Sequence, residues 1–223
     1  MKSCGILFAV LSLSTLTATQ VSAETLMFRQ GDSGAYSSTQ GAYVTLMTHT
    51  GNGASTVVRV TTILDFPSSL GFLRFPDIIG NAAGQIPPGS TIESAYLNLT
   101  RFNNSGQIAY LGLVNEAWEE GTITGASYPG VSGGAGSVPA GAGGSHAIAD
   151  ITSAVQAWAS GTPNWGVRIM AGFSQSTSDQ SFYSDDATVL STRPLLTVTF
   201  SAPPTATSHS TWGEVKALYH DVR

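Results

Sequence analysis

The sequence predicts an all-β fold, an antiparallel β-sandwich of the jelly-roll type with one short helix near residues 151–160. Two observations predict the sandwich. Most segments alternate apolar and polar side chains with a period of two, which is typical of strands that bury one face. Clusters of glycine, proline, asparagine and serine separate these runs at short intervals, as between the strands of a sandwich. About 200 residues remain after an N-terminal leader, enough for one large β domain or two small ones.

The first 23 residues have the features of a secretory signal peptide. Lys2 gives a positive start, residues 6–16 form an apolar run, and Val21 and Ala23 supply the small residues of a cleavage site. Because the apolar run is too short for a membrane span, we expect cleavage before residue 24 and a secreted or cell-envelope protein without a membrane span. A buried first helix is the alternative.

Cysteine and charge narrow the class of protein further. The only cysteine, Cys4, lies within the predicted signal peptide, so the mature chain has no disulfide, which favours a bacterial secreted protein with a large core. Removal of the signal peptide removes Lys2. The mature chain then has eight of the nine basic residues and all fourteen acidic residues, which gives a net charge of −6. This charge argues against nucleic acid and anionic membranes as partners. Every basic residue of positions 24–205 is an arginine, which suits either an acidic ligand or plain structural roles.

Three segments show the strand alternation most clearly: residues 91–100, 164–170 and 194–200. Their apolar faces are formed by Ala95, Leu97 and Leu99; by Trp165, Val167 and Ile169; and by Leu196, Val198 and Phe200. Alternate residues point to opposite faces of a strand. The residues between these apolar positions, Arg168 and Tyr96 among them, are therefore expected to face away from the core.

Residues 151–158 break the alternation and predict the helix. Ile151, Val155 and Trp158 have the i, i+4, i+7 spacing of one helical face, so Trp158 is expected in the core. Asp150 is the expected N-cap, and Gly161 is expected just after the C-terminus.

Two other regions have unusual composition. Residues 130–145 are rich in glycine and almost without large side chains, which predicts a flexible loop. The sandwich domain is expected over residues 24–202, followed by a linker and short helical tail over 203–223. In the tail, Thr211 and Glu214 have capping-box spacing, and a helix this short would either dock on a partner or stay mobile.

The order of several motifs is informative. Leu73-Arg74-Phe75, Asp77, a Pro-Pro-Gly turn at 87–89 and Ser94-Ala95 follow one another, and then come Trp118-Glu-Glu-Gly-Thr, residues 150–169 and an Arg-Pro-x-Leu-x-Val strand from residue 193. This order, over about residues 25–200, resembles the DNRLRE domain, the family also classed as carbohydrate-binding module family 96. The resemblance implies a β-sandwich that binds polysaccharide, since some members bind acidic glycans such as alginate. The chain departs from the family in its first turn and in the glycine-rich run.

Four outward-facing residues are the resulting candidates for carbohydrate binding: Tyr96, Asn98, Tyr110 and Arg168. Tyrosine rings stack on sugar faces, asparagine hydrogen-bonds hydroxyls, and arginine grips a uronate carboxylate at two points. Ordinary exposed strand residues are the alternative interpretation for each of them.

Glu119 and Glu120, beside Trp118, raise the question of sugar cleavage. The two carboxyls of a retaining glycosidase flank one bond about 5 Å apart. Neighbouring residues of a strand point to opposite faces, so this pair predicts a turn and not an active site. His49 and His146 are too far apart in the sequence, and too isolated, to predict a zinc site.

Asp185 and Asp186 are the best candidates for a metal, as oxygen ligands of a structural calcium ion, with solvated charges as the alternative. No other cofactor is predicted. The sequence therefore predicts a secreted, non-catalytic module whose partner is a polysaccharide or cell-surface component. The alternative is an extracellular structural or adhesion protein with a C-terminal docking tag.

Overall fold

The computed structural model describes residues 22–32, 36–173, 175 and 177–204. The predicted signal peptide, except for Ser22 and Ala23, and the predicted helical tail lie outside the described residues and stay predictions. Within the described ranges the chain forms β1 (Ala23–Phe28), β2 (Gln40–Thr45), β3 (Thr50–Asn52), β4 (Val57–Ile63), β5 (Phe66–Arg74), β6 (Thr91–Thr100), β7 (Ala109–Val114), β8 (Val131–Val138), β9 (His146–Asp150), α1 (Thr152–Ala159), β10 (Val167–Ala171), β11 (Ser178–Tyr183), the 3-10 turn η1 (Leu190–Thr192) and β12 (Leu195–Ser201). None of the helices in these ranges has the length and apolarity that a membrane span needs.

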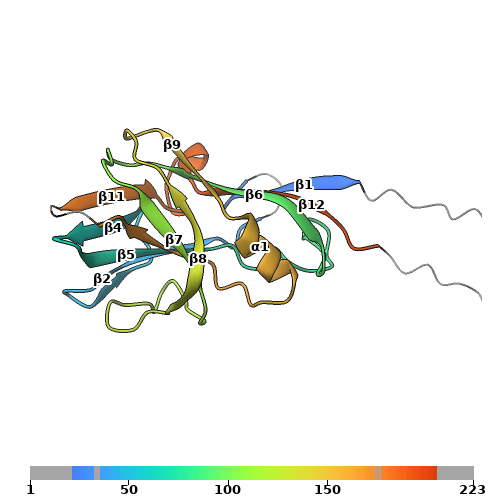
Figure 1. Cartoon of the computed structure of the whole chain (residues 1–223), viewed down its shortest axis with the longest axis horizontal. Helices are drawn as coiled ribbons and strands as arrows, with labels where there is room; N and C mark the ends of the chain where they lie inside the picture. The colour runs from blue at the N-terminus through green and yellow to red at the C-terminus, as the bar shows by residue number, and fades with distance from the viewer. Residues whose placement is uncertain (1–21, 33–35, 174, 176, 205–223) are drawn as a thin grey trace, which may run out of the picture.

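Two antiparallel sheets pack face to face, which confirms the predicted all-β sandwich (Figure 1). The four-stranded sheet has the order β1-β12-β6-β9. The eight-stranded sheet runs β11-β4-β5-β10-β7-β8, and β2 pairs with both β5 and β3. In Figure 1, β1 and β12 lie at one end of the molecule, and β2, β4, β5 and β11 extend to the opposite end.

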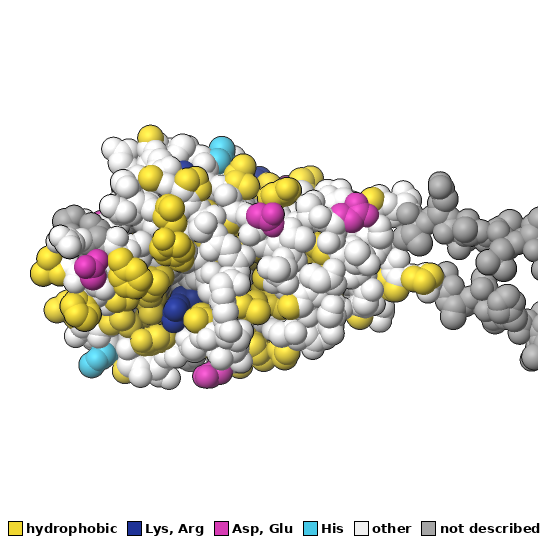
Figure 2. Space-filling view, in the orientation of Figure 1, with side chains coloured by type: hydrophobic (Ala, Val, Ile, Leu, Met, Phe, Trp, Pro, Cys, Tyr) yellow, Lys and Arg dark blue, Asp and Glu magenta, His cyan; other side chains and the backbone are white. Residues whose placement is uncertain are grey.

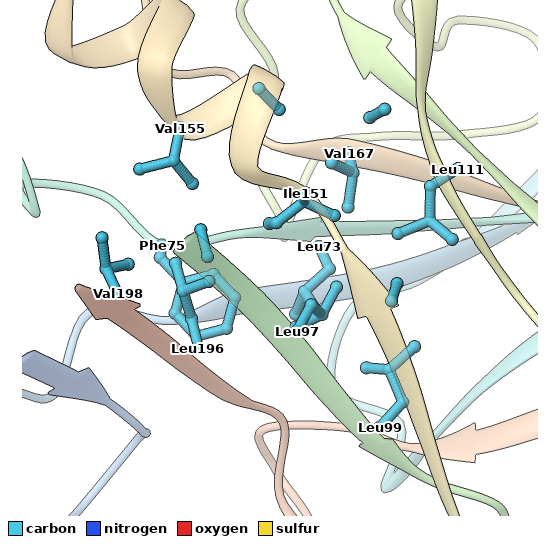
Figure 3. Close-up of a cluster of buried hydrophobic side chains, with 14 of the residues drawn as sticks. Leu73, Phe75, Leu97, Leu99, Leu111, Ile151, Val155, Val167, Leu196 and Val198 are labelled. Atoms are coloured by element: carbon cyan, nitrogen blue, oxygen red, sulfur yellow. The ribbon is translucent and has the colours of Figure 1, made fainter. Parts of the chain in front are cut away.

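The core lies between the sheets and follows the predicted alternation. Leu97 and Leu99 of β6 are at most 1% exposed, as are Leu196 and Val198 of β12. Figure 3 shows these side chains pointing toward residues of the other sheet, such as Leu111. Burial of these aliphatic faces is the main stabilising contribution to a sandwich that has no disulfide in the described chain.

The predicted helix is confirmed as α1, which packs against β6, but its N-cap differs from the prediction. Ile151 and not Asp150 occupies the N-cap position, and its side chain makes no capping hydrogen bond. The Asp150 carboxylate still accepts hydrogen bonds from the backbone N–H of Thr152 (2.9 Å) and from its hydroxyl (2.6 Å). Gly161 follows the C-terminus at φ 102°, as predicted, and Trp158 is buried.

The glycine-rich segment is not the loop that its composition predicts, because residues 131–138 form strand β8 at the edge of the eight-stranded sheet. Backbone hydrogen bonds to β7 hold this strand in place, and these bonds need no side chains. Ala135 and Val138 anchor it in the core. At Gly136 (φ 152°) an added Cβ would collide with the carbonyl of Asp150, so a glycine is required where β9 passes.

A second apolar cluster covers part of the outer face of the eight-stranded sheet. Its strand members are Ala42, Val44, Leu70, Phe72 and Val114. Trp118 and Ile123, from the segment of residues 115–130, lie over them. The Phe72 and Trp118 rings are 5.7 Å apart between centroids. This segment therefore covers only part of the outer face and leaves Tyr110 of β7 exposed and Arg168 of β10 half-buried.

Candidate functional site

Arg168 and Tyr110 lie together on the uncovered part of the eight-stranded sheet. Arg168 of β10 pairs with Gly112 of β7 on one side and with Phe72 of β5 on the other. Tyr110 is two residues before Gly112, so it shares the outer face with Arg168, at the diagonal spacing of about 7–8 Å. Tyr110 is 47% exposed. The ring of Tyr128 packs against Phe72 with 6.3 Å between centroids, which brings a second tyrosine to this surface.

The guanidinium of Arg168 is half-buried and has no hydrogen bond or ion pair with any described residue. Burial lowers the pKa of Arg168 from its ordinary value, and the nearby Tyr128 opposes this shift. Arginine remains protonated in proteins, so the group is a cation without a counter-charge in the described chain. A buried or half-buried charge gains from a ligand that supplies the missing partner.

Glycine and valine line the surface beside Arg168. Gly112 pairs with Arg168, Gly134 of β8 pairs with Gly112, and the Val131 side chain lies over Gly112, where an added Cβ would meet it at 2.9 Å. Added Cβ atoms at Gly133 and Gly134 would meet no heavy atom within 4 Å, so the backbone there is open to solvent. Figure 2 shows hydrophobic side chains gathered over the end of the molecule where β4, β5 and β7 lie, with a basic side chain among them. We name the surface of Tyr110, Arg168, Tyr128 and these glycines the sheet surface.

A separate cleft of about 810 Å³ lies beside the start of β2. It is lined by residues 37–40, 74, 76, 77, 79, 119, 120, 162, 164 and 165. Arg74 is 6% exposed and lies at its floor, with its guanidinium 5.6 Å and 5.5 Å from the ring centroids of Trp118 and Trp165. We name this space the Arg74 cleft.

The guanidinium of Arg74 interacts with polar side chains of the same chain. Its Nη2 donates a hydrogen bond to Gln40 Oε1 (2.8 Å) and lies 3.6 Å from Glu119 Oε1. Gln40 Nε2 in turn donates to Glu119 Oε2 (3.2 Å). Arg74 is therefore a structural cation, in contrast to Arg168.

The two neighbouring glutamates have different surroundings. Glu119 is exposed and binds Gln40 and Arg74, whereas Glu120 is half-buried toward Asp186. Burial, and then the charge of Asp186, raise the pKa of Glu120 to about 7, against a hydrogen bond from the Gly41 backbone. The backbone N–H groups of residues 122 and 123 both donate to the Glu119 carbonyl, which confirms the predicted turn.

A family model described as carbohydrate-binding module family 96 matches residues 32–200, more than half of the chain. The chain belongs to this family. No curated protein matches it. The resemblance found in the sequence is thus confirmed for the carbohydrate-binding family, and the sheet surface and the Arg74 cleft are the two candidate sites of a carbohydrate-binding module.

The structure separates the four predicted binding residues of the module into two pairs. Tyr110 and Arg168 share the sheet surface. Tyr96 and Asn98 lie on β6 and point outward from the four-stranded sheet, with Tyr96 46% exposed. Because the two sheets pack face to face, the two pairs face opposite sides and do not form one site. Their roles in binding stay predictions.

The predicted calcium ligands follow β11. Asp185 is 4% exposed and its Oδ1 has no partner among the described residues, while Asp186 is exposed. Burial, and then the charge of Glu120, raise the pKa of Asp185 to about 8. Within the described residues no three His, Cys, Asp or Glu side chains are grouped to hold a metal ion. Calcium binding by the module therefore stays a prediction that rests on adjacent carboxylates.

Sequence reasoning missed most of what surrounds Arg168. Tyr128 stands in a Tyr-Pro-Gly turn, which gives no sign that its ring reaches Phe72 across 56 positions. Composition predicts a loop for the glycines of β8, so the sequence does not place them beside Arg168. The sequence did not predict the Arg74 cleft, although its Arg74 and Glu119 lie in two of the motifs that resemble the family.

Proposed function

We propose that the chain is a secreted, non-catalytic module that binds acidic polysaccharide on its sheet surface. The observation that carries the proposal is the guanidinium of Arg168, a cation without an ion pair in the described chain and beside the exposed ring of Tyr110. A uronate carboxylate matches the planar fork of a guanidinium, and a tyrosine ring offers a stacking face to a sugar. Gly133 and Gly134 of β8 leave open space for a polymer next to the Val131 side chain.

The surroundings of the glutamates support a non-catalytic role. Glu119 is held by Gln40 and Arg74, while Glu120 turns toward Gly41 and Asp186. Two catalytic carboxyls would flank one glycosidic bond from a common site. Carboxyls with such different partners serve the turn and the walls of the cleft.

Arg168→Gln is expected to weaken binding to alginate and polygalacturonate by about tenfold or more, since a hydrogen bond to a charged group contributes about 1.5–3 kcal/mol. Affinity electrophoresis in gels with each polysaccharide measures the loss. Arg59→Gln is the matched control, because Arg59 is an exposed arginine of β4 in the same sheet. Equal losses of binding in both variants would show that net charge, and not the position of Arg168, causes the effect. Release of reducing ends from the polysaccharide by the wild type would contradict a non-catalytic role.

A second candidate function, an extracellular structural or adhesion role, is favoured by one observation. The ends of the β2–β3 and β4–β5 hairpins expose Met47, Leu64 and Phe66, which are 78%, 62% and 76% exposed. Leu64 (φ 47°) and Asp65 (φ 67°) form a two-residue turn in the left-handed region, where leucine is disfavoured. Strain retained at an exposed apolar residue is typical of a contact surface.

Leu64→Asn is expected to stabilise the domain by up to about 1 kcal/mol, because asparagine tolerates the left-handed conformation and leucine does not. Urea unfolding measures the gain. Under the adhesion role the same variant loses binding to the cell surface while Arg168→Gln keeps it. A variant that is no more stable than the wild type would show that the turn carries no strain.

A further inference from the structure

We propose that the Arg74 cleft is a second carbohydrate subsite of the module, and that it takes an uncharged sugar residue. The inference shares with the proposed function only that the module binds carbohydrate, and it concerns a different surface and a different sugar chemistry. The volume of the Arg74 cleft, about 810 Å³, falls within the range of about 300–1,000 Å³ that is common for small-molecule sites.

Charge decides which sugars fit. Asp77, Glu119 and Glu120 contribute three carboxyl groups to the walls, and Arg74 is the cation among the described lining residues. Glu119 already lies 3.6 Å from Arg74, so the guanidinium offers little attraction to a ligand carboxylate. Placing a uronate here would bring like charges together, which discriminates strongly against it. The cleft thus excludes the sugars that suit the sheet surface.

The same groups are suited to hydroxyls. Ionised carboxylates only accept hydrogen bonds, and sugar hydroxyls donate them. The carboxylate of Asp77 is exposed at the cleft and has no hydrogen bond to any described residue. Glu119 accepts from Gln40 through one oxygen and retains free lone pairs for a ligand.

An aromatic wall completes the arrangement. Trp165 lines the cleft, is half-buried, and its indole N–H has no hydrogen-bond partner among the described residues. A sugar ring presents C–H groups that pack on an indole while its hydroxyls reach polar groups, as tryptophan combines an apolar body with one donor. At the floor, Arg74 is more than nine-tenths buried and is held by Gln40 and Glu119. The cleft therefore offers a stacking wall at Trp165 together with the Asp77 and Glu119 carboxylates.

The backbone holds Asp77 in an unfavourable conformation at this place. Its φ is 58°, in the left-handed region, although it is not a glycine. Gln85 fixes this conformation by donating from Nε2 to the Asp77 carbonyl (2.7 Å). Such residues persist where the surrounding structure constrains them, and they concentrate at binding sites. The constraint sets the carboxylate at the rim of the cleft before a ligand arrives.

Isothermal titration of the full chain with cellohexaose, mannohexaose and xylohexaose tests the proposal, with an alginate hexamer as the acidic probe. At least one neutral hexamer is expected to bind saturably. Asp77→Asn and Glu119→Gln are expected to weaken that binding by about tenfold each, or about 1.4 kcal/mol. Both substitutions preserve shape, and asparagine tolerates the φ of Asp77. The resonance of the Trp165 indole N–H, identified through Trp165→Phe, is expected to shift on titration.

Two controls separate this subsite from the sheet surface. Glu116→Gln removes an exposed carboxylate of the same segment outside the cleft and is expected to leave neutral binding unchanged. Arg168→Gln is expected to weaken alginate binding by about tenfold or more and to leave neutral binding intact. The subsite is refuted if no neutral hexamer binds, or if neutral binding survives the Asp77→Asn/Glu119→Gln double variant or disappears in Arg168→Gln. The proposed function fails separately, if the alginate hexamer does not bind.

Discussion

Replacing Asp185 by asparagine is expected to raise the stability of the domain at pH 8.5 and to flatten the fall in stability between about pH 4 and pH 8. Asp185 is 4% exposed, and its Oδ1 finds no partner in the described chain. An added Cβ at Gly41 would collide with this oxygen, so the β2 backbone closes over it. Burial is the largest cause, and the charge of Glu120 the second, of a pKa raised from 3.8 to about 8. Ionisation of such a group opposes folding.

The direction of the pH dependence follows from proton binding in the two states. Between about pH 4 and pH 8 the folded state holds a proton on Asp185 that the unfolded state has released, so the free energy of unfolding falls as pH rises. Below this window both states are protonated, and the loss is complete above it. At about 1.4 kcal/mol for each pKa unit, the loss amounts to at most about 6 kcal/mol. Asparagine keeps the shape and cannot ionise.

Urea unfolding at pH 5, 7 and 8.5 measures the effect, with Asp186→Asn as the control at the exposed neighbour. We expect Asp185→Asn to lose most of the pH dependence and the control to retain it. Parallel pH profiles for Asp185→Asn and wild type would contradict the buried acid. Calcium chloride at pH 8.5 adds a further comparison: if Asp185 and Asp186 bind calcium, the ion stabilises the wild type and has no effect on Asp185→Asn.

The strands that alternate apolar and polar side chains could be predicted from the sequence. Burial of one face of a strand requires an apolar residue at every second position, and this alternation is visible in the sequence. β6 and β12 were predicted in this way, and their apolar positions lie in the core. β8 could not be, because glycines carry no side-chain pattern. Its position depends on backbone hydrogen bonds to β7 and on two small anchors, Ala135 and Val138. Composition predicts flexibility for such a segment, and pairing with a neighbouring strand overrides it.

The candidate sites were only half predictable for a related reason. Alternation states which residues of a strand face outward, so Tyr110 and Arg168 could be chosen. It does not state which sheet a strand joins, and Tyr96 was grouped with them although β6 belongs to the other sheet. The Arg74 cleft is lined by segments far apart in the sequence. Asp77 and Trp165 line the same cleft only because long-range strand pairing brings their segments together.

Trp118→Ala is expected to destabilise the domain by about 3–5 kcal/mol, the usual cost of truncating a buried tryptophan. Trp118 is 5% exposed and packs on Phe72. Its ring lies 5.6 Å from the Arg74 guanidinium, and its Nε1 donates to the Trp165 carbonyl (2.8 Å). No other aromatic side chain of the segment of residues 115–130 is buried to this degree, so the alanine variant leaves that segment poorly anchored.

The same substitution should weaken both candidate sites at once, because the segment carries Glu119 of the Arg74 cleft and Tyr128 of the sheet surface. Trp118→Phe is the control: it keeps an aromatic ring over Phe72 and loses the hydrogen bond to the Trp165 carbonyl, so about 1–2 kcal/mol is expected. Urea unfolding measures stability, and titration with alginate and neutral hexamers measures binding. If Trp118→Ala unfolds like the wild type, the segment is held by other contacts. If the alanine variant is destabilised but still binds both kinds of sugar, the order of the segment does not shape either site.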